Sequence, residues 1–137
     1  MRVDFYHLQS WTLEKALPPL LERALGAGFR AVVLAASDER VEALASLLWT
    51  FRPDSWLPHG TVKDGQAADQ PIWLGTRDEN PNGANLMVLT DGMATVQAGF
   101  DRCLDVFDGN DPDALAGARS RWKDAKALGH ELHYWQP

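Results

Sequence analysis

The sequence predicts an α/β fold, a single three-layer domain with a mostly parallel central sheet. Short apolar runs at residues 3–8, 30–36 and 85–90 are typical of buried strands. Segments with apolar residues at helical spacing alternate with these runs, which favours right-handed crossovers between parallel strands. A length of 137 residues with 45% hydrophobic residues suits one domain with one core, spanning residues 1–137.

The first half of the chain has the pattern strand, helix, strand, helix. A helical pattern over residues 12–25 begins with Thr12 at the N-cap position and ends at two glycines. Pro18 and Pro19 lie inside it and predict either a kink or a later start. After the second strand, Ser37 can cap another helix that reaches about Trp49, with an apolar stripe of Val41, Leu44, Ala45 and Leu48.

The second half has a less regular pattern. Residues 71–75 predict a short strand, residues 77–84 a turn region, and residues 85–90 another buried strand. Residues 96–107 are ambiguous, and we expect a short helix followed by a strand around 103–107. Asp111 as N-cap and Pro112 at the first helical position predict a helix to about Leu128, which Gly129 ends. Residues 131–135 predict a final short strand.

The charge balance excludes several classes of protein. The chain has 13 Lys and Arg against 19 Asp and Glu, a formal net charge of −6. This disfavours a protein that coats nucleic acid or binds an anionic membrane surface. One cysteine, Cys103, allows no internal disulfide. The N-terminus has no signal-peptide pattern, and no apolar run approaches membrane-spanning length, so we expect a soluble, cytoplasmic protein.

The motifs of catalytic and metal sites are missing or incomplete. The glycines at 26 and 28 follow a helix and precede a strand, the reverse of the dinucleotide-binding order, and there is no phosphate-binding glycine loop. His130 and His133 are expected on opposite faces of a strand, which argues against zinc. The acidic residues between 101 and 113 lack the calcium-loop spacing. We therefore expect no metal, no cofactor and no catalytic residue.

An aromatic cluster lies at residues 49–59, a partly irregular region. Trp49, Phe51 and Trp56 are three large aromatic side chains within eight residues. Two interpretations remain open. The rings can cover the core, or some can stay exposed as an anchor for another protein, because tryptophan is favoured at binding hot spots.

The last helix carries the most concentrated positive charge. Four of the 13 basic residues lie between 119 and 126, and only Asp124 opposes them there. At about 100° per residue, one face carries Leu115, Arg119, Trp122 and Lys126, with Lys123 at its edge. Ala118, Ala125 and Leu128 are expected on the neighbouring, core-facing side. The stripe is interpreted either as a solvated basic face with one buried tryptophan or as a groove for an acidic peptide.

The chain resembles the chi subunit of bacterial DNA polymerase III holoenzyme, an accessory subunit of the clamp-loader complex, over nearly its full length. The similar segments include FYHL at 5–8, the helix end at 43–49, RPDSWLPH at 52–59, the strand start at 71–72, NLMVL at 85–89, DVFD at 105–108 and ARSRWK at 118–123. The resemblance implies a fold similar to mononucleotide-binding (Rossmann-like) domains that binds no nucleotide. It also implies an adaptor in the replisome, the bacterial, nucleoid-associated replication machinery.

The resemblance implies two binding surfaces. One contacts the psi subunit of the clamp loader, with Trp56 in the contacting position and Trp49, Phe51 and Leu57 beside it. The other binds the acidic, Phe-ended C-terminal tail of single-stranded DNA-binding protein, with Arg119 at the acidic end and Trp122 next to it. Leu115 stands where some members have a lysine, and Lys123 or Lys126 can compensate.

These inferences lead to one expected function and one alternative. We expect a non-catalytic subunit of a DNA-directed DNA polymerase holoenzyme, a nucleotidyltransferase, that joins the clamp loader to single-stranded DNA-binding protein and so reaches DNA indirectly. The alternative is a small nucleotide-dependent enzyme on the same scaffold. Such an enzyme needs a phosphate site near residues 9–12 or 37–38.

Overall fold

The structure, a computed structural model, describes residues 1–54 and 57–137. Within these residues one six-stranded sheet forms, with the strand order β3-β2-β4-β5-β1-β6, and all neighbouring strands are parallel. The elements are β1 (Arg2–Leu8), α1 (Leu13–Gly26), β2 (Ala31–Leu34), α2 (Asp38–Thr50), the 3₁₀ turn η1 (Ala67–Asp69), β3 (Ile72–Gly75), β4 (Leu86–Leu89), β5 (Arg102–Asp108), α3 (Pro112–Ala127) and β6 (Glu131–Trp135).

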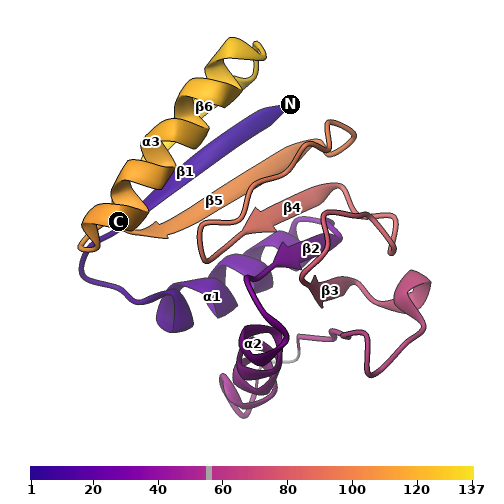
Figure 1. Ribbon diagram of the computed structural model, residues 1–137. Helices are drawn as coiled ribbons and strands as arrows, with labels where there is room; N and C mark the ends of the chain where they lie inside the picture. Colours follow the sequence, from indigo (N-terminus) through magenta and orange to yellow (C-terminus); the bar gives the residue numbers. More distant parts are fainter. Residues whose placement is uncertain (55–56) are drawn as a thin grey trace.

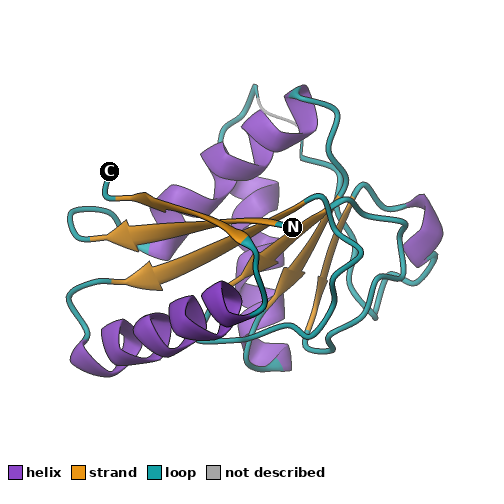
Figure 2. Cartoon of the chain, turned by 90° about the horizontal axis from the view of Figure 1, so that it is seen from above, coloured by secondary structure: helices purple, strands orange, loops and turns teal. Residues whose placement is uncertain are grey.

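The helices lie on both faces of the sheet, and this confirms the predicted three-layer α/β fold (Figure 1). One core cluster joins α1 and α2 to one face, through residues such as Leu17 and Leu44. A second cluster joins α3 to the opposite face through Ala118, Leu115 and Trp122. Figure 2 shows α3 and α1 on opposite sides of the strands.

The predicted helix starts are confirmed by their caps. The Thr12 hydroxyl accepts a hydrogen bond from the backbone N–H of Lys15, and Ser37 does the same for Arg40. These bonds satisfy N–H groups that the first helical turn leaves unpaired. All four apolar residues predicted to form the inner stripe of α2 are buried.

The two prolines do not delay α1, which begins at Leu13 directly after its cap and includes both Pro18 and Pro19. Each proline removes one backbone N–H, so the carbonyls of Glu14 and Lys15 lose their usual helical donors. Both of these residues are exposed, and water can therefore satisfy their carbonyl oxygens.

The short helix expected near residue 96 is wrong, whereas the strand that follows it is confirmed as β5. The segment before β5 is a loop that Asp78 holds in place. Its carboxylate accepts from the Thr95 hydroxyl at 2.6 Å and from the Val96 backbone N–H at 2.8 Å, and its carbonyl accepts from the Gln97 side chain. A backbone N–H bound to Asp78 is not available for a helical hydrogen bond, so tertiary contacts override the local pattern.

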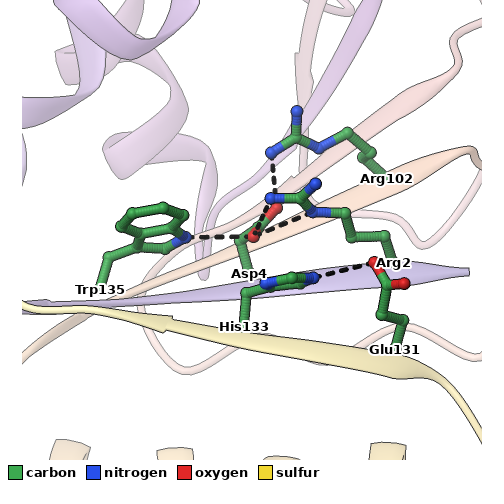
Figure 3. A network of polar contacts seen from close by, with 6 residues as sticks. All are labelled: Arg2, Asp4, Arg102, Glu131, His133 and Trp135. Atoms are coloured by element: carbon green, nitrogen blue, oxygen red, sulfur yellow. Dashed lines mark hydrogen bonds and ion pairs between the residues drawn. The ribbon is translucent and has the colours of Figure 1, made fainter.

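A buried carboxylate ties three strands together on the α1 side of the sheet (Figure 3). Asp4 of β1 is fully buried and accepts from Arg102 Nη2 at 2.7 Å, from Trp135 Nε1 at 3.1 Å and from Arg2 Nη2 at 3.2 Å. Burial by itself raises the pKa of Asp4, but the hydrogen bonds from Arg102, Trp135 and Arg2 outweigh it and hold this pKa below its ordinary value. The carboxylate is therefore ionised in the folded protein at neutral pH.

We expect Asp4→Asn to lower the free energy of unfolding by about 2 kcal/mol at neutral pH, because charge-assisted hydrogen bonds are lost in a buried place. A pKa that is lower in the folded state gives stability that is present above the unfolded-state pKa and is lost as pH falls through the folded-state pKa. In urea unfolding, the difference in free energy of unfolding between wild type and Asp4→Asn should therefore become smaller below about pH 4. Asp69→Asn, at an exposed aspartate, is the control, and an equal effect of the two variants at neutral pH would count against this role.

Candidate functional site

The caps of helix α3 fix where it begins and ends, and its inner face fixes which side chains point toward the sheet. The Asp111 carboxylate accepts from the backbone N–H of Asp113 at 2.9 Å, and Pro112 occupies the first turn. Gly129, with φ of 80°, follows the C-terminus as predicted. On the inner face, Trp122 packs against Phe5 of β1, with 5.1 Å between the ring centroids.

The core-facing side of α3 differs in part from the sequence expectation. Ala118 is buried as predicted, and Leu115 and Trp122 are partly buried against the same core cluster. Leu128 was expected on the core side, but it is 74% exposed, because it forms the C-cap at the point where the chain turns toward β6. The inner side is therefore the Leu115–Trp122 side, and Trp122 keeps part of its ring accessible.

Three cations project from α3 next to this tryptophan. Arg119, Lys123 and Lys126 are exposed, and no ion pair to them is found among residues 1–54 and 57–137. We call these three residues the α3 basic surface. Unpaired cations beside a half-buried aromatic ring and Leu115 suit a ligand that combines carboxylates with an apolar side chain.

Arg121, the fourth basic residue of this helix, has a different role. Its guanidinium points inward and binds the Asp105 carboxylate of β5 through two bonds, Nε to Oδ2 at 2.5 Å and Nη2 to Oδ1 at 3.0 Å. Both side chains are largely buried. Burial raises the pKa of Asp105, and the hydrogen bond from Arg121 lowers it in part. The pair anchors α3 to the sheet, so Arg121 is not available to a partner.

The aromatic cluster after α2 divides into exposed and buried members. Trp49 is 67% exposed at the end of α2, and its ring lies 5.0 Å from that of His59. Phe51 is partly buried against the core, and the Arg52 guanidinium lies 4.8 Å from its ring centroid. Leu57 is a buried core residue. Trp56, the position that the resemblance favours most for contact with psi, lies outside the described residues.

His59 provides polar support beneath Trp49. Its Nδ1 lies 2.7 Å from the carbonyl oxygen of Leu57 and donates to it, because a carbonyl only accepts. Nε2 is buried and has no hydrogen-bond partner within the described part of the chain. This hydrogen bond therefore holds the His59 ring, which the exposed Trp49 ring contacts, against the backbone at Leu57.

A pocket of about 650 Å³ lies at the carboxyl ends of β1 and β5. In open α/β sheets this edge, where the crossovers leave in opposite directions, is the usual place for a nucleotide. Arg40 lies here too, but it is bound to Asp91 at 3.2 Å and to Glu14 at 3.3 Å. The carboxylates that line the pocket would repel phosphate groups, and they belong to Glu14, Asp91, Asp108, Asp111 and Asp113.

Within the described ranges, no group of three or more His, Cys, Asp or Glu side chains is placed to hold a metal ion. Cys103 is buried in β5, and burial raises the pKa of its thiol, which disfavours the reactive thiolate form. His133 lies beside Glu131 on β6, with 2.8 Å between Nε2 and Oε2. In the same residues, none of the helices is long and apolar enough to cross a membrane.

The parallel sheet with helices on both faces defines a three-layer α/β protein whose switch-point pocket is acidic and whose last helix carries exposed cations. The sequence model of one family, described as DNA polymerase III chi subunit, HolC, matches residues 1–133. The chain therefore belongs to the DNA polymerase III chi subunit family.

A curated relative agrees with this assignment. The probable DNA polymerase III subunit chi of Rickettsia prowazekii (strain Madrid E) is 33% identical over 86 residues, which are 63% of this chain and 52% of that protein. The match thus spans about half the length of the curated relative.

Proposed function

We propose that this chain is a non-catalytic adaptor of the bacterial replicative polymerase. It links the clamp loader, through the psi subunit, to the acidic C-terminal tail of single-stranded DNA-binding protein. Membership of the chi family supports the assignment to DNA polymerase III. The observation that carries the tail assignment is the α3 basic surface, three exposed cations without ion pairs in the described residues, beside partly accessible Trp122.

The tail would bind through two kinds of contact. Its carboxylates would meet the Arg119 guanidinium, which offers a planar pair of donors, while Lys123 and Lys126 add positive charge along the helix. Its terminal phenylalanine would pack on Trp122 and on Leu115, which offers apolar surface in place of a charge. A titration with a synthetic peptide ending in Asp-Phe tests this directly. Saturable binding that weakens with added salt supports the proposal, and no binding by folded protein contradicts it.

The acidic body of the chain supports an indirect route to DNA. The net charge of −6 disfavours direct binding to phosphates, and the basic α3 surface, with three cations, is too small to follow a nucleic-acid strand. The protein that coats single-stranded DNA would supply the contact instead. The alternative of a nucleotide-dependent enzyme is disfavoured, because the pocket where its phosphate would bind is lined with carboxylates.

For the psi surface, we expect that Trp49→Ala and Trp56→Ala each abolish co-purification of the chain with the psi subunit. A tryptophan side chain at the centre of an interface commonly contributes about 2 kcal/mol or more, and Trp49 is exposed. The measurement is a pull-down of co-expressed psi with tagged chain. Val96→Ala truncates an exposed apolar side chain at another place and serves as the control.

Trp49→Ala keeps this prediction testable even if Trp56→Ala fails to fold, because the Trp49 ring is mostly solvent-exposed. Normal recovery of psi with a folded Trp49→Ala variant would contradict this surface, whether or not the Trp56→Ala variant folds.

A further inference from the structure

A second exposed surface lies on the α1 side of β1 and β6, away from the α3 basic surface. Along these strands, Asp4 pairs in register with His133 and Tyr6 with Trp135, and these side chains share one face of the sheet. Figure 3 shows Asp4, Arg2, Arg102, His133 and Trp135 rising on that face. Helix α1 packs over β5, α2 over β3, and α3 over the opposite face. Parallel sheets normally have both faces covered by helices, so this part of the sheet lacks its usual outer layer.

The uncovered face forms a trough with an apolar floor. A groove of about 490 Å³ runs between α1 and the end of β6, lined by Leu20 and Pro19 on one side and Trp135 on the other. Tyr6 forms its floor and stacks with Trp135, with ring centroids 6.4 Å apart. Trp135 is 46% exposed and Trp11, at the end of the groove, 51%. Large aromatic side chains gathered at this exposure are typical of a contact surface.

The trough continues past this groove along α1. An adjoining cavity of about 190 Å³ shares Tyr6, Leu20 and Arg23 with it and is also lined by Phe29 and Arg102. The shared residues make the two cavities one continuous depression beside the helix. Such an elongated shape, with apolar residues along the middle, fits a helix better than a compact small molecule.

The rim of the trough is cationic. Arg23 is exposed, and no ion pair to it occurs in the described ranges. Arg2 and Arg102 bind the buried Asp4 carboxylate but keep part of their side chains accessible. On the same face, the Glu131 carboxylate lies beside His133 and lines neither cavity, and the charged side chains that line the two cavities are Arg23 and Arg102. The accessible charge at the rim is therefore positive, which favours a partner with acidic residues.

We propose that this trough binds an amphipathic helix of a partner protein, whose apolar residues pack on Tyr6, Leu20 and Trp135 and whose acidic residues meet Arg23 and Arg102. A second copy of this chain fits poorly, because a two-fold contact would place the arginine rims against each other. The proposal is independent of the proposed function, since it uses the sheet face opposite α3 and none of the residues assigned to the tail or to psi.

The test uses two synthetic amphipathic helices of about 18 residues, long enough for some helix formation in isolation. Both have one leucine face, flanked by glutamates in the first peptide and by lysines in the second. Fluorescence polarisation measures affinity, and NMR follows the indole N–H signals. The expected result is binding of the glutamate peptide, with shifts at Trp11 and Trp135 and none at Trp122, and at least about tenfold weaker binding of the lysine peptide.

Arg23→Glu should weaken binding of the glutamate peptide about tenfold, because a like charge replaces the cation at the rim. Lys15→Glu, at an exposed site of the same helix that lines neither cavity, is the matched control and should change the affinity little. Equal affinity for the two peptides, shifts at Trp122 alone, or an unchanged affinity in folded Arg23→Glu would overturn the proposal. Concentration-dependent dimers that Arg23→Glu abolishes would also overturn it, in favour of a second copy.

Discussion

Arg119→Ala should weaken binding of a peptide ending in Asp-Phe by about 2–5 kcal/mol, the range expected when one partner of a desolvated charge pair is removed. Arg119 is exposed and makes no ion pair in the described part of the chain, so its loss should leave the fold intact. The guanidinium offers the peptide carboxylates paired donors that lysine does not have, and Arg119→Lys should therefore recover only part of the affinity. Isothermal titration calorimetry at low salt measures both effects.

Arg77→Ala is the matched control for this experiment. Arg77 is an exposed arginine that follows β3, at the opposite edge of the sheet from β6. If the measured affinity depended only on overall charge, the two alanine variants would weaken binding equally, and such a result would contradict a specific site on α3. Unchanged affinity in a well-folded Arg119→Ala variant would exclude the site altogether.

Arg121→Met should lower the free energy of unfolding by about 3–5 kcal/mol, because it leaves the Asp105 carboxylate buried without its charge partner. The two residues differ in sequence position by 16, and their bonds join α3 to β5. The double variant Asp105→Leu with Arg121→Met should recover most of the loss, since an apolar pair of similar volume needs no compensation. Urea unfolding of the wild type, the single variant and the double variant measures these differences.

The pH dependence of Arg121→Met provides an independent check. In this variant burial still raises the pKa of Asp105, and the lowering contribution of Arg121 is gone. A carboxyl group with a raised folded-state pKa binds its proton more tightly in the folded than in the unfolded protein. The free energy of unfolding should therefore increase as pH falls from 7 toward about 4. The same contribution is lost when pH rises again through the folded-state pKa. The double variant has no carboxyl group at position 105. If the free energy of unfolding of Arg121→Met changed between pH 7 and 5 in the same way as that of the double variant, Asp105 would not be the group that causes the pH dependence.

Much of the fold could be predicted from local patterns. The apolar runs of β2 and β4 indicated strands buried on both faces, and both are fully buried. Thr12, Ser37 and Asp111 indicated the helix starts, because a side-chain cap depends on residues only two or three positions away. The short helix expected near residue 96 is wrong because the backbone there depends on a distant residue. Asp78, which lies 18 positions from Val96, accepts a hydrogen bond from the Val96 backbone N–H.

The candidate site on α3 could be predicted only in part from the sequence. Helical spacing placed Arg119, Trp122 and Lys126 on one face, with Lys123 at its edge. The count of four basic residues between 119 and 126 also included Arg121, which the structure shows bound to Asp105. A carboxylate within an apolar strand, such as Asp4 or Asp105, signals that a cationic partner exists. The spacing along one strand does not say which arginine it is, because the partner comes from another element.

The sequence by itself thus determined the order of the strands and of α1, α2 and α3, the acidic net charge and the concentration of basic residues near the C-terminus. These properties depend on composition and on neighbours within one or two helical turns. Tertiary structure alone decided which cations remain unpaired, which tryptophans are exposed and which part of the sheet lacks a covering helix. Side-chain burial and charge pairing depend on contacts between residues distant in sequence, such as Arg102 with Asp4 and Trp122 with Phe5.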